Sequence, residues 1–206
     1  MALNNGVISY LDSAGGRSEI KVGGPCADLW ISPDGDTIAF IRIDRSQPDH
    51  FALAPFIEAS TIFVASRSAR FAPVRVAIEP PKIDGRIWKV FHAPVLSPGR
   101  DTVYFLVPAA GTSWFLMSAP VTGGAALPIN YVEAYCVLWG GKDSGALLFM
   151  ARQMGSGAQG VTHSYYFYKH SGGTVKVGMP DEGRYFGEFA RRWIRERGGT
   201  CQFNLN

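Results

Sequence analysis

Four stretches of the sequence share one eleven-residue pattern. Each opens on a large apolar residue and closes on phenylalanine ten positions later, with a polar turn that contains glycine in between. Glycine and aspartate supply the backbone angles that tight turns need, so the pattern predicts a strand–turn–strand hairpin in each copy. The copies occupy residues 30–40, 95–105, 139–149 and 193–203.

A second hairpin pattern accompanies the first. It follows three of the copies, at residues 62–78, 114–129 and 164–178, and occurs once more at the other end of the chain, at 7–23. The chain therefore begins with the second half of a repeat and ends with the first half. Strands from the two ends of such a chain can complete one shared sheet, which leaves the ring of sheets without an open edge.

The repeats predict an all-β fold, a small β-propeller with four blades of four antiparallel strands, closed by pairing of the N- and C-terminal strands. The whole chain, 1–206, would form this single domain. Blade 1 is expected at 25–79, blade 2 at 90–130 and blade 3 at 134–178, and blade 4 would be shared by 1–24 and 187–206.

Two alternatives remain open at this point. One is a partial ring of three and a half blades that dimerises. The other concerns residues 187–196, whose charges would suit a short surface helix. The repeat register places Trp193 in a strand, and we adopt that interpretation.

The first copy, WISPDGDTIAF, resembles the repeat of TolB-like, WD40-like β-propellers, known as the PD40 repeat, which also occurs in prolyl-oligopeptidase propellers and tricorn-type proteins. The resemblance extends over most of the chain but is strong only at 30–41 and 95–106, because the later copies lack the Ser-Pro pair. It implies protein or peptide binding more often than catalysis, and no particular ligand. Propellers of this family usually have six or seven blades, whereas this chain has material for four.

Composition and charge exclude several classes of protein. The 206 residues carry a formal net charge of +3, which excludes a strongly basic nucleic-acid binder, so nucleic acid is not expected as a partner. No stretch has the roughly 18 apolar residues of a membrane helix, so no membrane association is expected. The N-terminus lacks the features of a secretory signal peptide, which predicts a cytoplasmic protein, or a periplasmic or secreted one if a signal peptide was removed.

The cysteines and histidines show no metal-binding spacing. Cys26, Cys136 and Cys201 lie far apart without a C-x-x-C motif, so we expect neither a zinc site nor a disulfide framework and interpret all three as small buried hydrophobic residues. The sequence also lacks the H-E-x-x-H, nucleophile-elbow and phosphate-loop motifs. We therefore expect no cofactor and no metal.

The long loops indicate where recognition would occur. In a propeller, the loops after the second strand and between blades emerge on one face, and here they are the long segments 44–60, 79–90, 151–163 and 179–190. On the channel wall, Asp28 would form an ion pair with Arg191 of the adjacent blade. The candidate binding residues are Asp49, His50, Phe51, His92, Glu133, His163, Glu188 and Arg191.

Two functions of different classes follow from these features. The first is a non-catalytic protein- or peptide-binding propeller, for example an inhibitor or immunity-type partner of another protein, acting as a monomer or homodimer. The alternative is a hydrolase or lyase acting on a glycan or peptide. In that enzyme His50, His92 or His163 would transfer a proton together with a carboxylate on the same face.

Overall fold

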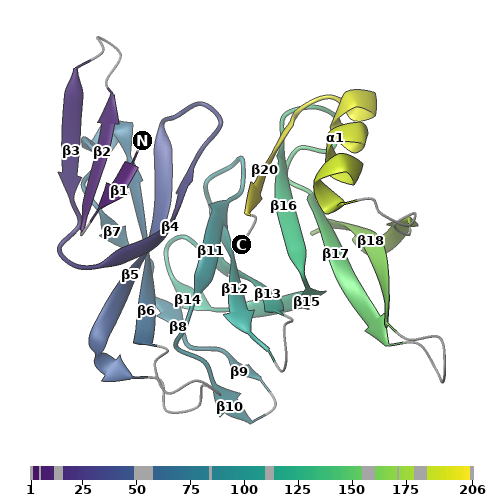
Figure 1. The fold of residues 1–206 in the computed structure, drawn as a ribbon, viewed down its shortest axis with the longest axis horizontal. Coiled ribbons are helices and arrows are strands. Elements are labelled where there is room, and N and C mark those ends of the chain that lie inside the picture. Colours follow the sequence, from purple (N-terminus) through teal and green to yellow (C-terminus); the bar gives the residue numbers. More distant parts are fainter. Residues whose placement is uncertain are drawn as a thin grey trace.

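The chain folds mainly into antiparallel β-sheets (Figure 1). The structure is a computed structural model, and it describes residues 2–4, 6–11, 16–48, 58–83, 85–109, 114–154, 161–170, 172–178 and 185–204. Within these residues, no helix is long and apolar enough to cross a membrane.

Three larger sheets contain the sequence repeats. The first repeat sheet has the order β4–β5–β6–β7, the second β11–β12–β13–β15 and the third β19–β18–β17–β16–β20, while β1–β2–β3 form a separate N-terminal sheet. The elements are β1 (Ala2–Asn4), β2 (Val7–Leu11), β3 (Arg17–Lys21), β4 (Cys26–Ile31), β5 (Thr37–Pro48), β6 (Glu58–Ser66), a 3-10 turn (Arg67–Ala69), β7 (Val74–Arg75), β8 (Ile78–Glu79), β9 (Lys82–Ile83), β10 (Arg86–Ile87), β11 (His92–Leu96), β12 (Thr102–Pro108), β13 (Trp114–Pro120), β14 (Gly124–Ala125), β15 (Leu127–Val132), β16 (Ala134–Trp139), β17 (Leu147–Met154), β18 (Val161–Lys169), β19 (Gly173–Gly178), α1 (Phe186–Arg197) and β20 (Thr200–Asn204).

The hairpins expected from the first three copies of the eleven-residue pattern are confirmed. Strands pair antiparallel across each short turn: β4 with β5, β11 with β12, and β16 with β17. The phenylalanine that closes each pattern is completely buried. Burial fixes the strand register, because a shift by one residue would turn the phenylalanine ring out of the core. These residues are Phe40, Phe105 and Phe149.

The second hairpin pattern is also confirmed, in β2 with β3, β6 with β7, β13 with β15, and β18 with β19. In Figure 1 the strands β5, β12 and β17 all run toward the lower edge of the molecule. We call the side at which these three strands end the long-loop face. The opposite side, which carries the tight turns that precede them, is the short-turn face.

The Ser-Pro turns owe their shape to one serine hydroxyl. The Ser32 hydroxyl accepts the Thr37 N–H at 2.9 Å and donates to the Asp34 carboxylate at 2.6 Å. In the second repeat sheet the Ser97 hydroxyl likewise accepts the Thr102 N–H, at 3.2 Å, but it donates to Asp101, which aligns with Asp36 and not with Asp34. The bond that both turns share, from the threonine N–H to the serine hydroxyl, replaces the water that a tight turn would otherwise need and explains why serine recurs in the pattern.

The ring does not close as the sequence predicted. The C-terminal strand β20 pairs antiparallel with β16, the first strand of the third repeat sheet, with Phe203 opposite Cys136. The N-terminal strands pair only with one another among the described strands, and they lie on the far side of the molecule from α1 (Figure 1). The expected pairing of the N- and C-terminal strands into a shared sheet is therefore wrong.

The fourth hairpin, expected at 193–203, is also wrong because Trp193 lies in the helix α1. Its apolar neighbours Phe186, Phe189 and Ala190 precede it at helical spacing, so all four side chains fall on one face of a helix. A strand would instead alternate these residues with arginines on both of its faces. Only β20, the second half of the expected hairpin, is extended.

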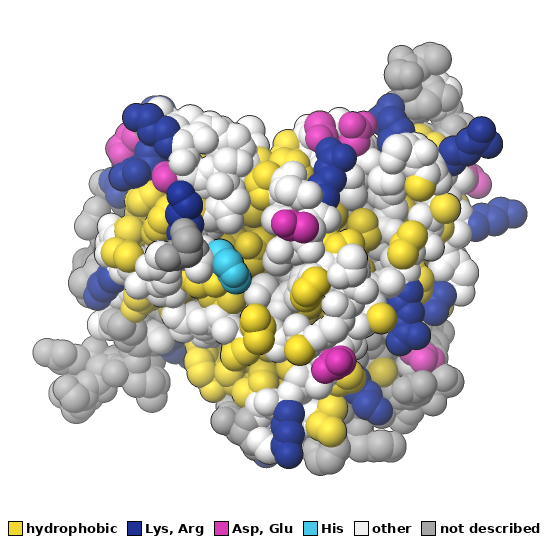
Figure 2. Space-filling view, turned by 180° about the vertical axis from the view of Figure 1, so that it is seen from behind, with side chains coloured by type: hydrophobic (Ala, Val, Ile, Leu, Met, Phe, Trp, Pro, Cys, Tyr) yellow, Lys and Arg dark blue, Asp and Glu magenta, His cyan; other side chains and the backbone are white. Residues whose placement is uncertain are grey.

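Both ends of the row of repeat sheets are covered. At one end α1 packs on the third sheet, where the Phe189 ring stacks on Tyr165 with centroids 4.2 Å apart. At the other end Ile8 and Ile20 of the N-terminal sheet share a buried cluster with Phe40 of the first sheet. Seen from behind, hydrophobic side chains gather in the middle of the molecule and most lysines and arginines lie toward its periphery (Figure 2). The two end elements thus act as caps, as terminal repeats do in other repeat proteins.

A disulfide joins Cys136 of β16 to Cys201 of β20, with Cα atoms 5.8 Å apart. The expectation that the chain has no disulfide is therefore wrong. The two cysteines are 65 residues apart, and only the unexpected pairing of β20 with β16 brings them together. Cys26 stays a free, half-buried thiol. Burial raises the pKa of this thiol, and the nearby Arg42 offsets that effect only in part.

Candidate functional site

Asp28 links the first and second repeat sheets on the long-loop face. Its Oδ2 accepts the Ala93 N–H at 2.9 Å and lies 3.3 Å from His92 Nδ1. Asp28 and Ala93 occupy equivalent bulges of β4 and β11, with φ of 51° and 53°. Burial raises the pKa of Asp28, but the hydrogen bonds from His92 and Ala93 outweigh it and hold the pKa below its ordinary value. Asp28 therefore stays ionised at neutral pH.

The expected ion pair between Asp28 and Arg191 is wrong. Arg191 lies on the exposed side of α1, which covers the third repeat sheet, whereas Asp28 belongs to the first. The expectation depended on a closed ring, in which residue 191 would have entered the adjacent blade as a strand.

Glu133 organises a second cluster, at the third repeat sheet. It lies between β15 and β16, where its backbone N–H donates to the Met150 carbonyl. Arg152 and His163 are cross-strand partners on β17 and β18. Arg152 Nε donates to Glu133 Oε1 at 2.8 Å, and His163 Nε2 lies 2.8 Å from Glu133 Oε2. Both carboxylate oxygens of the mostly buried Glu133 are thus occupied.

Trp114 lies between the two clusters. Its ring meets the His92 ring edge to face, with centroids 5.0 Å apart, and its cross-strand partner on β15 is Val132, which directly precedes Glu133. Along the three repeat sheets these residues form a row, in which Trp114 contacts His92 and is related to Glu133 only through the backbone of Val132. This row, which we call the polar row, consists of Asp28, His92, Trp114, Glu133, Arg152 and His163.

Sequence reasoning found part of this row. It placed His92, Glu133 and His163 on one face, and the structure joins Glu133 directly to His163. It missed Trp114 and Arg152 as site residues. Both Arg152 and His163 fall in the segment 151–163, which was expected as a long loop, whereas β17 and β18 extend into this segment and pair there. The signal that could have found Arg152 was the expected antiparallel order of the strands in this blade, which pairs the strands on either side of the loop.

The structure does not place the other candidate residues in the polar row, for two different reasons. Asp49, His50 and Phe51 lie outside the described residues, so the structure does not test them. Glu188 and Arg191 are exposed on α1, and no hydrogen bond or ion pair among the described residues connects either of them to the row. Within the same part of the chain, no three His, Cys, Asp or Glu side chains form a group that could hold a metal ion.

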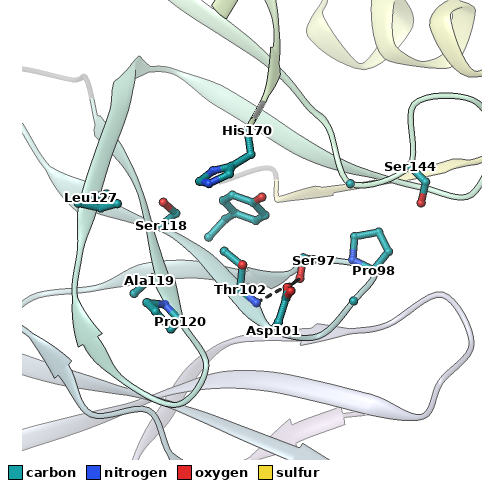
Figure 3. A pocket seen from close by; sticks show the side chains of 13 residues that line it. Ser97, Pro98, Asp101, Thr102, Ser118, Ala119, Pro120, Leu127, Ser144 and His170 are labelled. Atoms are coloured by element: carbon teal, nitrogen blue, oxygen red, sulfur yellow. Dashed lines mark hydrogen bonds between the residues drawn. The ribbon is translucent and has the colours of Figure 1, made fainter. Parts of the chain in front are cut away.

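The short-turn face has a cavity of about 640 Å³ between the second and third repeat sheets. Figure 3 shows Asp101 on one wall, Ser118 and Leu127 on another, and His170 opposite the turn that holds Asp101. Tyr104 also lines it, and burial raises the pKa of this tyrosine to about 12. The sequence predicted recognition on the long-loop face and assigned no role to this side of the molecule.

The chain matches no protein-family model and no curated protein. Among solved structures it is similar to Kuenenia stuttgartiensis hydrazine synthase, with 17% identity and a TM-score of 0.49 over 87% of this chain and 50% of that one. It is also similar to the β-propeller domain of the Trilobed protease from Pyrococcus furiosus, which has an open velcro topology, with 13% identity and a TM-score of 0.50 over 84% of this chain and 53% of that one. The chain thus spans about half the length of each. The similarity to the second of these structures shows that the chain has a β-propeller fold.

Proposed function

We propose that the chain is a non-catalytic propeller module that binds a protein or peptide through the polar row on its long-loop face. The observation that carries this proposal is that both carboxylates of the row are held by partners within the protein. Asp28 is bonded to Ala93 and His92, and both oxygens of Glu133 are bonded to Arg152 and His163. Groups that hold one another in place form a rigid recognition surface.

The side chains left partly exposed in the row are suited to binding. Trp114 is half-buried, and the side chain of Arg152 is 37% exposed. Tryptophan and arginine are enriched among the residues that carry most of the energy of protein interfaces. Arg152 can offer its remaining N–H groups to a partner while Glu133 fixes its orientation.

A photo-crosslinking experiment tests the proposal. A photoreactive phenylalanine analogue replaces Tyr131 of β15, which is 47% exposed beside the row, in one protein and, as a matched control, Val175 of β19, which is 54% exposed away from the row. We expect one specific protein adduct from position 131 and none from position 175. The purified partner should then bind the Trp114→Ala variant about tenfold or more weakly than the unsubstituted chain. The same adducts from both positions, or no effect of Trp114→Ala, would contradict the proposal.

A second candidate function is supported by the contact between His163 and Glu133, since a histidine oriented by a carboxylate can transfer protons. In that case the chain would be a hydrolase or lyase acting on a glycan or peptide. The test is turnover of a glycan and peptide library, in which activity abolished by both His163→Gln and Glu133→Gln would favour the enzyme over the binding module.

We also infer that the repeats are of the PD40, TolB-like type. The serine-centred turns at Ser32 and Ser97 support this assignment, because in both the serine hydroxyl accepts the backbone N–H of the threonine five residues later, which gives a structural reason for the serine that the first two copies share. The caps at both ends of the row of sheets favour a monomer over the homodimer, since the apolar faces of both end sheets are covered.

The disulfide favours an oxidising compartment over the cytoplasm.

A further inference from the structure

The cavity on the short-turn face contains an aspartate that lacks the arginine partner of its counterparts. Four aspartates lie in the short turns of the repeat sheets, and three of them pair with an arginine. Asp34 pairs with Arg100, Asp36 with Arg67 at 3.2 Å, and Asp143 with Arg197 at 3.6 Å.

The fourth aspartate, Asp101, is the one that lines the cavity. Its carboxylate accepts hydrogen bonds from the Ser97 hydroxyl and from the side chain and the backbone of Thr102. No arginine or lysine of the described chain pairs with it. It is exposed at the cavity wall, and the hydrogen bond from Ser97 is the main reason that its pKa lies below the ordinary value. Its charge is therefore present and uncompensated at neutral pH.

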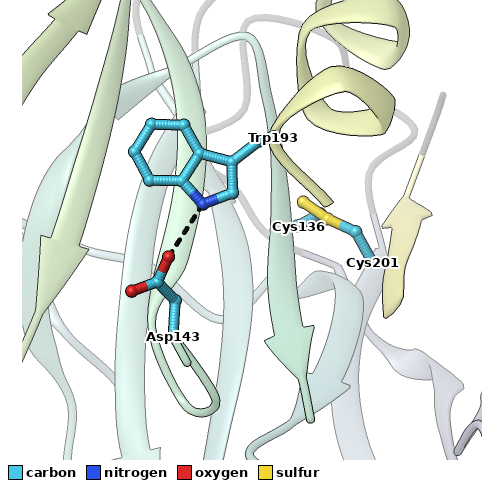
Figure 4. Close-up of a disulfide and its surroundings, with 4 residues drawn as sticks. All are labelled: Cys136, Asp143, Trp193 and Cys201. Atoms are coloured by element: carbon cyan, nitrogen blue, oxygen red, sulfur yellow. Dashed lines mark hydrogen bonds between the residues drawn. A yellow bond between two sulfur atoms is a disulfide. The ribbon is translucent and has the colours of Figure 1, made fainter. Parts of the chain in front are cut away.

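The third-sheet turn shows what occupies such a position elsewhere in the same chain. Asp143 accepts the Trp193 indole N–H at 3.0 Å (Figure 4). It also pairs with Arg197, whose guanidinium lies over the Trp193 ring at 4.2 Å. Both partners come from α1, an element outside the turn. A turn aspartate of this protein thus binds a guanidinium that another segment delivers.

We propose that the cavity beside Asp101 binds the arginine side chain of a partner peptide. The guanidinium would pair with the carboxylate of Asp101, and its alkyl stem would lie along Leu127 and Pro120, both of which line the cavity. The hydroxyl of Ser118 can accept a further guanidinium N–H. This site is separate from the polar row, and it does not depend on the function proposed for that row.

The size and charge of the cavity fit this ligand. Its volume of about 640 Å³ falls within the range of ligand pockets and exceeds one arginine side chain, which leaves room for flanking residues of a peptide. No lysine or arginine is among the described residues that line it, and the carboxylate of Asp101 would repel phosphate and other anionic ligands.

The probe for the test is the peptide acetyl-Gly-Arg-Gly-amide, titrated into the isotope-labelled full chain and followed by NMR. The expected result is binding with a dissociation constant on the order of 1 mM, with shifts of the amides of Asp101, Ser118, Leu127 and His170. The citrulline peptide, which has the same shape but no charge, should bind about tenfold or more weakly.

Two variants and one matched control complete the test. Asp101→Asn keeps an acceptor for Ser97 but removes the charge, and Asp36→Asn makes the same change at the aligned position of the first sheet. Ser118→Phe fills the cavity without changing the turn that contains Asp101. It therefore tests whether the peptide binds in the cavity even if Asp101→Asn does not fold. Loss of binding in Asp101→Asn and Ser118→Phe but not in Asp36→Asn is expected. Equal binding of the citrulline peptide, shifts elsewhere on the protein, or no binding at all would overturn the proposal.

Discussion

The carboxylate of Asp28 accepts the backbone N–H of Ala93 at 2.9 Å and so joins the first strands of two neighbouring sheets. The carbonyl of the same residue, Ala93, accepts the hydroxyl of Tyr135 from the third repeat sheet. Both backbone groups of one residue thus connect three sheets that are far apart in sequence. Because Ala93 and Tyr135 are completely buried, neither bond can be replaced by water at the surface.

Replacing Asp28 by alanine should destabilise the fold. The change leaves the buried Ala93 N–H without its acceptor and puts alanine at a positive φ, which together cost about 2–4 kcal/mol of unfolding free energy. Asp28→Asn is the matched control, since asparagine keeps an acceptor oxygen and tolerates this backbone conformation. Chemical denaturation measures both variants. Equal stability of Asp28→Ala and the unsubstituted protein would show that the link does not hold the sheets together.

Tyrosine ionisation should weaken the fold at high pH. Burial raises the pKa of Tyr104 to about 12 and that of Tyr135 well above its ordinary value. The unfolded chain therefore loses these protons first, so the tyrosine contribution to stability is full below about pH 10 and falls as the pH rises above it. Denaturation at about pH 9 and pH 11 measures the effect. Tyr135→Phe should lower stability by about 1 kcal/mol at the lower pH and make the alkaline loss smaller. An unchanged alkaline loss in this variant would contradict the assignment to Tyr135.

Acid should destabilise the protein through its turn and inter-sheet aspartates. Hydrogen bonds from serine hydroxyls are the main cause of the lowered pKa of Asp34 and Asp101, and bonds from His92 and Ala93 outweigh burial at Asp28. Because these pKa values are lower in the folded chain, the stability they contribute is full above about pH 4 and is lost as the pH falls below it. Thermal unfolding between about pH 3 and pH 6 tests this, and a midpoint that does not fall toward pH 3 would count against it.

Disrupting the α1 cap should expose the third repeat sheet. Phe189→Asp places a charge against Tyr165 in a buried cluster, at a cost of about 3–5 kcal/mol. Arg191→Asp introduces the same residue on the exposed side of the same helix and should leave the melting temperature nearly unchanged. Thermal melting and size-exclusion chromatography distinguish the two, with aggregation or a lower melting temperature expected only for Phe189→Asp. Similar behaviour of both variants would mean that α1 does not protect the sheet.

The sequence predicted those parts of the fold that depend on local pattern. Hairpins such as that ending at Phe105 follow from alternation and turn chemistry within eleven residues, and they were expected correctly. The position of β20 depends on which sheet edge it pairs with, and local pattern holds no information on that choice. The apolar spacing of Phe189 and Trp193 fits a helix, whereas the repeat alignment predicts a strand at Trp193.

The candidate site shows the same division. Glu133 and His163 could be placed on one face because both lie near the ends of expected strands, and in the structure their side chains lie 2.8 Å apart, a contact that the sequence did not predict. The role of Trp114 could not be foreseen, since it arises from the contact with His92 between strands that are not neighbours in the chain. The cavity beside Asp101 depends on the spacing of two sheets, which no single segment determines.

The pairing of β20 with β16, on which the open arrangement of the sheets rests, can be measured by disulfide mapping. The full chain is exposed to a mild oxidant in its folded state, digested without reduction and analysed by mass spectrometry. A linked pair of peptides containing Cys136 and Cys201, with Cys26 free, is the expected result. Three free thiols would contradict the account, and so would a link from Cys201 to Cys26, which would place the C-terminal strand beside the first repeat sheet.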